Sequence, residues 1–238
     1  MTESATELSL SQDDAYLLDH AAWASLTGPH AHLAEVRGQA ARYPADVSPF
    51  IGVAPDPDER VWADLAALAG PGAFVPLTGV EAAPPDGWEV LEAGEGVQMV
   101  DTAVAAQWHP DVVRLGPGDV PDMLALTART KPGPFLPRTI EMGTYLGLRD
   151  QGALVALAGQ RLHPPGWVEI SAVCTDAAYR GRGLATRLVQ SVAADIRDAG
   201  SRPFLHAVGT NVNAIRLYQS IGFTLRRRAR FSVARIPR

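Results

Sequence analysis

The spacing of apolar residues changes near the middle of the chain. Apolar positions recur at helical intervals over residues 13–25 and again over 60–69. Proline and glycine are frequent in 43–57 and 70–87, which are therefore expected to be loops. The pattern predicts a first half of helices and loops, followed by a strand and connector at 94–108.

Strand and helix patterns alternate beyond residue 110. Alternating apolar positions predict strands at 112–115, 144–149, 153–162, 167–175, 203–209 and 223–233. A period near 3.6 residues predicts helices at 119–129, from 138, from 184 to 200 and at 211–221. This order favours an α/β (α+β) fold with a mixed sheet. We place a soft boundary between an acidic N-terminal region, 1–110, and a second unit, 111–238.

Composition limits the class of protein. Of 238 residues, 47% are apolar and 20% charged, which allows a sizeable core. The single cysteine, Cys174, excludes a disulfide framework and a cysteine-based metal cluster, and no metal is expected. No apolar run approaches about 18 residues, and the N-terminus lacks the pattern of a secretory signal. We therefore expect a soluble cytoplasmic protein without membrane contacts.

The net charge of −5 conceals an asymmetry between the two halves. Residues 1–110 hold 3 basic and 17 acidic residues (3 − 17 = −14), and residues 111–238 hold 18 basic and 9 acidic residues (18 − 9 = +9). One interpretation is that the two units attract each other and the basic one faces an anionic ligand. The other is that an arginine-rich composition reflects genome bias alone.

The strand 167–175 leads into a glycine turn and then a helix. Such a turn directs free backbone N–H groups outward at the positive end of the helix dipole, where phosphate binds. Gly181 and Gly183 allow close approach to the main chain, and Arg180 and Arg182 add charge. A dinucleotide fingerprint and a Walker loop are both disfavoured, because Thr186 replaces the third glycine and no Gly-Lys-Ser/Thr occurs.

The same turn carries a family resemblance. The (Gln/Arg)xxGx(Gly/Ala) signature of the GNAT superfamily of acyl-CoA-dependent N-acyltransferases is matched by Arg180-Gly181-Arg182-Gly183-Leu184-Ala185. The preceding strand, EISAVCT at 169–175, is similar to that of one GNAT subgroup. Downstream the similarity continues at Asn213, Ala214, Leu217, Tyr218, Gly222 and Phe223. It covers roughly 112–235 and implies a mostly antiparallel central sheet flanked by helices. Some relatives carry a degenerate extra half-domain in front, which the resemblance suggests for 1–110.

The resemblance implies acetyl-CoA as cosubstrate and an amine as acceptor. The pyrophosphate would bind the amides of 181–186, the pantetheine arm would run beside Val173 to Thr175, and the Val173 N–H would polarise the thioester carbonyl. Asn213 would hold the arm from the other side. The implied cosubstrate-binding set is Val173, Cys174, Thr175, Arg180, Gly181, Arg182, Gly183, Leu184, Ala185, Thr186 and Asn213.

Acyl transfer to an amine needs a base. An ammonium group with a pKa of about 10 is neutral in only about one molecule in a thousand at pH 7. Glu169 shares strand parity with Ser171, Val173 and Thr175, and could face the cleft directly or through water. The alternative is a hydrogen-bonded strand glutamate with no chemistry. Glu141 is a reserve candidate.

The departing thiolate needs an acid. Tyr218 stands at the position that usually provides it in the GNAT family, and the alternative is a tyrosine of the core. Cys174 is expected to be a buried small residue, and His206 either relays protons or is a satisfied core histidine. The predicted function is N-acetyl transfer from acetyl-CoA to a primary amine by direct attack in a ternary complex. The alternative is a non-catalytic acyl-CoA-binding regulator.

Two features bear on partners. Arg226, Arg228 and Arg230 are expected on one solvated strand face, without the aromatic platform that nucleic-acid binding needs, and no nucleic acid is expected. Acceptor selectivity is expected in the loop 131–137, with Phe135 as a possible wall, and in residues 1–110. No motif identifies the acceptor or the oligomeric state.

Overall fold

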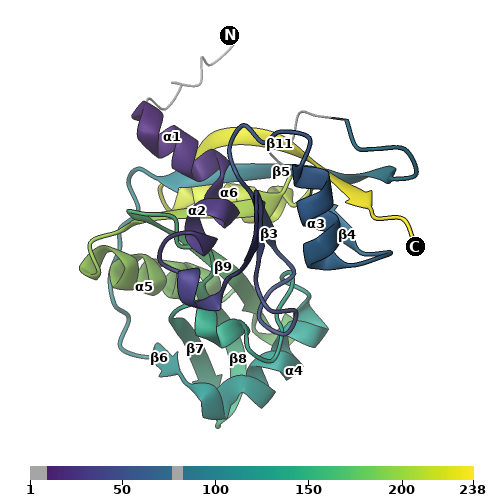
Figure 1. Cartoon of the computed structure of the whole chain (residues 1–238). Coiled ribbons are helices and arrows are strands. Elements are labelled where there is room, and N and C mark those ends of the chain that lie inside the picture. Colours follow the sequence, from purple (N-terminus) through teal and green to yellow (C-terminus); the bar gives the residue numbers. More distant parts are fainter. Residues whose placement is uncertain (1–9, 77–82) are drawn as a thin grey trace.

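One long sheet organises the protein. The computed structural model describes residues 10–76 and 83–238 (Figure 1). In spatial order the strands of this sheet are β4 (Phe74–Pro76), β11 (Phe223–Arg235), β5 (Glu89–Asp101), β10 (Arg202–Val208), β9 (Trp167–Thr175), β8 (Ala153–Gln160), β7 (Tyr145–Asp150) and β6 (Val113–Leu115). Within the described chain, β9 and β10 are its one parallel pair. The predicted mixed, mostly antiparallel sheet is confirmed.

The helices lie where the 3.6-residue period predicts them, except that the stretch 13–25 is divided into two helices and the helix expected from residue 138 is only a short 3-10 turn. They are α1 (Gln12–Asp19), α2 (Ala21–Leu26), α3 (Val61–Ala69), α4 (Val120–Thr130), α5 (Leu184–Asp198) and α6 (Val212–Ser220). Short 3-10 turns are η1 (Ala31–Leu33), η2 (Pro117–Asp119), η3 (Thr139–Met142) and η4 (Ala177–Tyr179). A small second sheet contains β1 (Glu35–Arg37), β2 (Ala40–Arg42) and β3 (Ile51–Val53).

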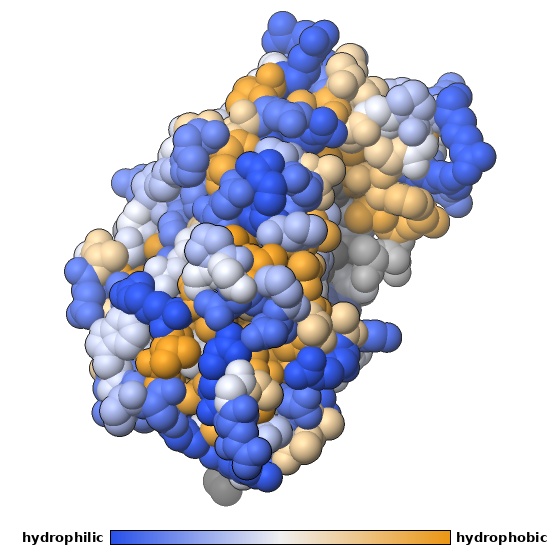
Figure 2. Space-filling model, turned by 90° about the horizontal axis from the view of Figure 1, so that it is seen from below, coloured by the Kyte–Doolittle hydropathy of each residue, from blue (hydrophilic) through white to orange (hydrophobic). Residues whose placement is uncertain are grey.

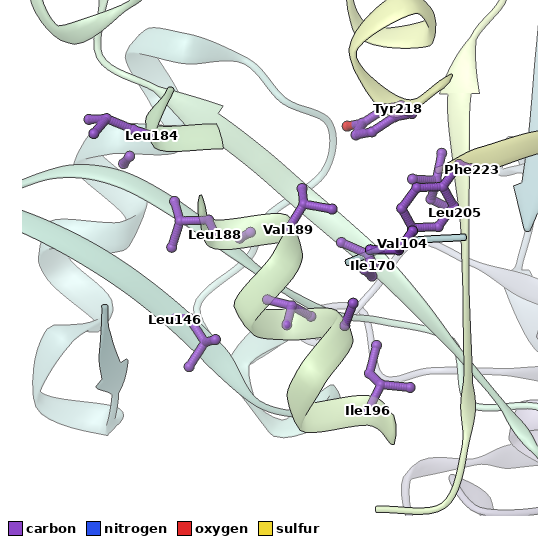
Figure 3. Packing of buried hydrophobic residues seen from close by; sticks show 14 of the residues in the cluster. Val104, Leu146, Ile170, Leu184, Leu188, Val189, Ile196, Leu205, Tyr218 and Phe223 are labelled. Carbon is purple, nitrogen blue, oxygen red and sulfur yellow. The ribbon is translucent and has the colours of Figure 1, made fainter. Parts of the chain in front are cut away.

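One face of the long sheet is covered by α5. Its apolar stripe is buried against the sheet, together with residues of α6 and β11 (Figure 3). The stripe consists of Leu184, Leu188, Val189, Val192 and Ile196. The opposite face is covered by α4 near β7 and β8, and by the N-terminal helices nearer β10. The sheet therefore forms the middle layer, and the junction of β9 and β10 lies between two helical layers.

The N-terminal residues are part of the same architecture. β5 lies between β10 and β11, so the boundary predicted near residue 110 does not separate two sheets. Ion pairs join the acidic first half to the basic second half: Asp14–Arg202, Asp19–Arg226, Asp19–Arg227, Asp46–Arg138 and Asp101–Arg197. The charge asymmetry thus acts within one folded body. The resemblance of residues 1–110 to a degenerate half-domain stays a prediction.

No helix in the described parts of the chain is both long and apolar enough to cross a membrane. On the face shown in Figure 2, apolar residues occur in several areas interspersed with polar ones.

Candidate active site

The turn before α5 presents a row of free backbone donors. The amides of residues 181–186 donate to no other described residue, and the first amide of α5 to find an acceptor is that of Arg187, bonded to the Gly183 carbonyl at 3.2 Å. Gly181 and Gly183 have φ of 76° and 72°, and a Cβ built on either would meet nothing within 4 Å. These residues therefore form an open cradle of backbone donors at a helix N-terminus, an arrangement that suits an anion.

Arginine side chains surround this cradle without being neutralised. Arg180 donates to the Thr175 carbonyl (3.4 Å), and Arg182 donates to the Ala178 carbonyl (3.1 Å) and lies over the Tyr179 ring. Neither guanidinium pairs with a described carboxylate. Both charges remain available to a bound anion, as the predicted site requires.

The strand leading to the cradle contains a bulge. Residues Ser171 and Cys174 of β9 pair with Gly159 and Leu157 of β8, so two residues of β9 lie opposite one of β8. Ala172 has φ of 54°, which is rare for a residue with a side chain. The pairing of β9 with β10 ends at Ile170, opposite Leu205, just before the bulge. Beyond this point the two parallel strands are not paired with each other. The bulge and the separation together expose main chain between β9 and β10.

The bulge overturns the expected parity of the strand. Ile170 packs with the α5 side of the sheet, and so does Val173, whereas Ala172 and Cys174 pack on the α4 side. An inserted residue reverses which positions share a face. Glu169 and Val173 therefore point to opposite faces, which the alternation in the sequence did not reveal.

Glu169 is buried and hydrogen-bonded, as its alternative interpretation expected. Its side chain is 0% exposed and accepts from Arg161 through Nε (2.7 Å) and Nη2 (2.5 Å), and from His206 through Nδ1 (2.7 Å). Burial raises the pKa of Glu169, but Arg161 and His206 outweigh burial and hold that pKa well below its usual range. The carboxylate is therefore ionised at neutral pH and is a weak base.

The protonation of His206 follows from Gln98. The Gln98 Oε1 accepts from Arg226 (2.5 Å) and its Nε2 donates to the Leu18 carbonyl (2.8 Å), which sets the orientation of the amide. The same Nε2 lies 3.0 Å from the His206 Nε2, which must be the acceptor. The His206 proton is therefore on Nδ1 and is directed at Glu169.

Tyr218 and the end of β9 meet at the gap between the parallel strands. Tyr218 is 8% exposed, packs against Phe223, and makes no hydrogen bond to another described residue (Figure 3). Burial, and then the proximity of Cys174, raises its pKa to about 12, so it is protonated at neutral pH. The Thr175 Oγ1 is buried without a partner in the described chain. This orphaned hydroxyl fits a polar arm lying along β9.

The structure also places three other residues singled out in the sequence. Asn213 is exposed on the first turn of α6, while Asn211 caps that helix by accepting from the Ala214 amide at 3.2 Å. Glu141 is exposed and held by Arg138 at 2.7 and 2.8 Å, outside the cavity described below. Cys174 is buried, as expected, and burial raises its pKa.

The predictions for Phe135 and Arg226 need correction, whereas Arg228 is exposed as expected and the side chain of Arg230 lies outside the described part of the chain. Phe135 is 9% exposed and packs on Tyr145 in the core, so it does not form a wall of that cavity. A second bulge follows Leu225. Because this extra residue turns the strand, Arg226 is not on a solvated face: it is 10% exposed and bonds Asp19 and Gln98.

A cavity of about 440 Å³ adjoins His206 and Arg161. Its walls come from α1, α2, β3, β4 and β11, and most of them are apolar. Periodicity could not have revealed this cavity, because its walls are separated by up to about 200 residues in sequence. Arg161 could have been suspected only from the rule that a buried acid needs a partner. Among the described residues, no group of three His, Cys, Asp or Glu side chains could hold a metal ion.

Comparisons with known proteins agree with this geometry. The FR47-like protein family model matches residues 145–232. A GNAT-family protein of known structure from Novosphingobium aromaticivorans is 37% identical, with a TM-score of 0.82 over 93% of this chain and 98% of that one. A GCN5-related N-acetyltransferase from Kribbella flavida, 16% identical, shares the fold with a TM-score of 0.57 over 92% of this chain and 96% of that one.

A curated relative matches in part. The N-alpha-acetyltransferase RimI of Mycobacterium tuberculosis is 39% identical over 90 residues, which are 35% of this chain and 56% of RimI. The chain thus spans just over half of that relative.

The fold and the cradle define a protein of the acyl-CoA-dependent acyltransferase class. The near full-length relative makes the assignment specific: this chain belongs to the GNAT family.

Proposed function

We propose that this protein transfers the acetyl group of acetyl-CoA to a primary amine by direct attack in a ternary complex. The observation that carries the proposal is the row of unpaired amides 181–186 beside Arg180 and Arg182, at the end of a bulged strand. Six unpaired donors in and just before the first turn of a helix suit a diphosphate, and the adjoining exposed main chain of β9 suits an extended arm. RimI, by its name, acetylates α-amino groups, which is consistent with an amine acceptor.

The arm of acetyl-CoA would lie between β9 and β10. Val173 would direct its N–H at the thioester carbonyl oxygen, because the bulge leaves this part of β9 outside the ladder with β8. The Thr175 Oγ1 supplies a hydrogen-bonding group that has no partner in the described protein. Cys174 contributes main chain only, since its side chain is buried on the α4 side. Asn213 would contact the arm from α6.

We assign the proton transfers to His206 and Tyr218. The ammonium proton moves to the His206 Nε2, in place of the hydrogen bond from Gln98, and the Glu169 carboxylate, which accepts from the His206 Nδ1, stabilises the imidazolium. The amine nitrogen then attacks the carbonyl carbon and the carbon–sulfur bond breaks. The thiolate takes the Tyr218 proton, and the proton lost by the new amide nitrogen restores the phenol. Glu169 is thus a positioning residue that acts through His206.

Calorimetric titration tests the first half of the proposal. Acetyl-CoA and CoA are expected to bind, and a short DNA duplex is not. Gly183→Val should weaken acetyl-CoA binding at least tenfold, because it places a side chain over the amides. Gly166→Val is the matched control: Gly166 has φ of 75° and equally open surroundings, but lies in another turn. Equal affinities of the two variants would contradict the cradle.

Thiol release from acetyl-CoA, measured with a panel of primary amines, tests the second half. Amine-dependent release is expected. Binding of CoA without release from any amine would refute catalysis and leave a non-catalytic acyl-CoA-binding protein.

A further inference from the structure

The cavity beside His206 is built for an apolar body. Trp23, Phe50, Ile51, Phe74 and Val233 form most of its walls, and its volume of about 440 Å³ lies within the range of small-molecule sites. These residues come from α2, the loop before β3, and strands β3, β4 and β11. The cavity therefore exists only because the N-terminal region folds against the long sheet.

The polar groups of this cavity gather at its β10 side. Arg161 and His206 both line it, and both donate to the same oxygen of Glu169, at 2.5 and 2.7 Å. Leu205 is the last residue of β10 that pairs with β9, and His206 follows it. This side of the cavity therefore adjoins the point where β9 and β10 separate. A molecule filling the cavity would thus have one end beside the predicted thioester position.

Arg161 has donor capacity left over. Its Nε and Nη2 are used by Glu169, whereas Nη1 donates to no described residue. The guanidinium lies 4.6 Å from the Phe50 ring centroid, and its side chain is 14% exposed. Stacking and the paired carboxylate together hold the plane of the guanidinium, so Arg161 is a fixed residue of the cavity wall that retains an unused donor, Nη1.

From this arrangement we infer that the acceptor is a small amine whose aromatic or branched apolar body fills the cavity and whose carbonyl or carboxylate oxygen, next to the amine, accepts from Arg161. This inference rests on the proposed acetyl transfer and adds its substrate class. An apolar amino acid or its amide has this chemistry. The ion pair with Glu169 already balances the charge of Arg161, so a neutral carbonyl is sufficient and a carboxylate is not required.

Four acceptors separate the contributions. Phenylalaninamide and phenylalanine carry both the apolar body and the oxygen, phenethylamine lacks the oxygen, and alaninamide lacks the body. We expect kcat/KM for phenylalaninamide to exceed that for alaninamide at least about tenfold, as deletion of apolar groups from a fitted pocket does. Phenethylamine should also fall below phenylalaninamide. The ratio of kcat/KM for phenylalanine to kcat/KM for phenylalaninamide distinguishes recognition of a carboxylate from recognition of a neutral carbonyl.

A pair of variants on α2 localises the effect. Ala22 lines the cavity and Ala24 does not. Ala22→Leu should lower the affinity of the CoA-saturated protein for phenylalaninamide at least about fivefold in calorimetric titration, with acetyl-CoA affinity unchanged. Ala24→Leu should change neither affinity. Urea unfolding of both variants verifies that each is folded.

The outcomes distinguish the acceptor class from acetyl transfer itself. Acetylation of all four amines at similar kcat/KM, or equal behaviour of Ala22→Leu and Ala24→Leu, overturns the substrate class and leaves acetyl transfer standing. Saturable binding of phenylalaninamide that Ala22→Leu weakens, without thiol release from any amine, supports the cavity assignment and overturns acetyl transfer.

Discussion

His30 and His163 lie side by side beneath the N-terminal helices, and lowering the pH should destabilise the protein through this pair. Their ring centroids are 4.5 Å apart, His30 hydrogen-bonds the Tyr43 hydroxyl at 2.8 Å, and the His163 Nε2 is buried without a partner in the described chain. Burial, and then the neighbouring His163, lowers the pKa of His30 to about 3, while the Met142 backbone and His32 have smaller, opposed effects. Burial lowers the pKa of His163 to about 4, against the attraction of Glu169.

The magnitude follows from proton linkage. In the unfolded chain both imidazoles have a pKa of about 6.5, so below that pH the unfolded state binds more protons than the folded state. Stability is therefore complete above about pH 6.5 and is lost as the pH falls towards the folded pKa values. Between pH 7.5 and 5.5 each histidine contributes about 1.4 kcal/mol of loss, or about 2.7 kcal/mol for the pair.

Urea unfolding at pH 7.5 and 5.5 measures this difference. His163→Gln should reduce the pH-dependent loss by about 1.4 kcal/mol, whatever it does to stability at either pH alone. Val47→Ala, at a fully buried position of the core cluster that contains Tyr43, should lower the free energy of unfolding equally at both pH values. If His163→Gln and the unmodified protein lost the same free energy between the two pH values, the assignment of a neutral buried pair would be wrong.

Three further predictions concern the site and its support. Tyr218→Phe should lower kcat for thiol release by about 10²–10⁴ while acetyl-CoA affinity in calorimetry stays the same, and an unchanged kcat would exclude it as the acid. Glu141→Gln should leave kcat and KM unchanged in the same assay, because its carboxylate is bound by Arg138 away from the cavity. Arg226→Met should cost about 1–3 kcal/mol in urea unfolding, since it removes bonds to Asp19 and Gln98, whereas the exposed Arg228→Met should cost less than about 0.5 kcal/mol.

The glycine turn before α5 and the environment of Glu169 are determined at different levels of structure. The amides at the cradle are free because glycine permits φ near +70° at two positions immediately before a helix, and that is a local property of the chain. The role of Glu169 is not local. Its carboxylate is fully buried and is bound by Arg161, which follows β8, and by His206 of β10, so the same residue that alternation placed in a cleft is a locked anion.

By itself, the amino-acid sequence determined the elements beyond residue 110, the mixed sheet and the glycine turn before α5, because helix and strand periods and glycine turns depend on neighbouring residues. It did not predict the short strands β1, β2, β3 and β4, which lie in a half that was expected to contain helices and loops. Tertiary structure alone decided which faces the side chains of β9 and β11 occupy, since a single inserted residue reverses strand parity and only pairing with β8 and β5 reveals the insertion. It also decided the cavity proposed for the acceptor, because Trp23, Arg161, His206 and Val233 meet only when the first and last parts of the chain pack on one sheet.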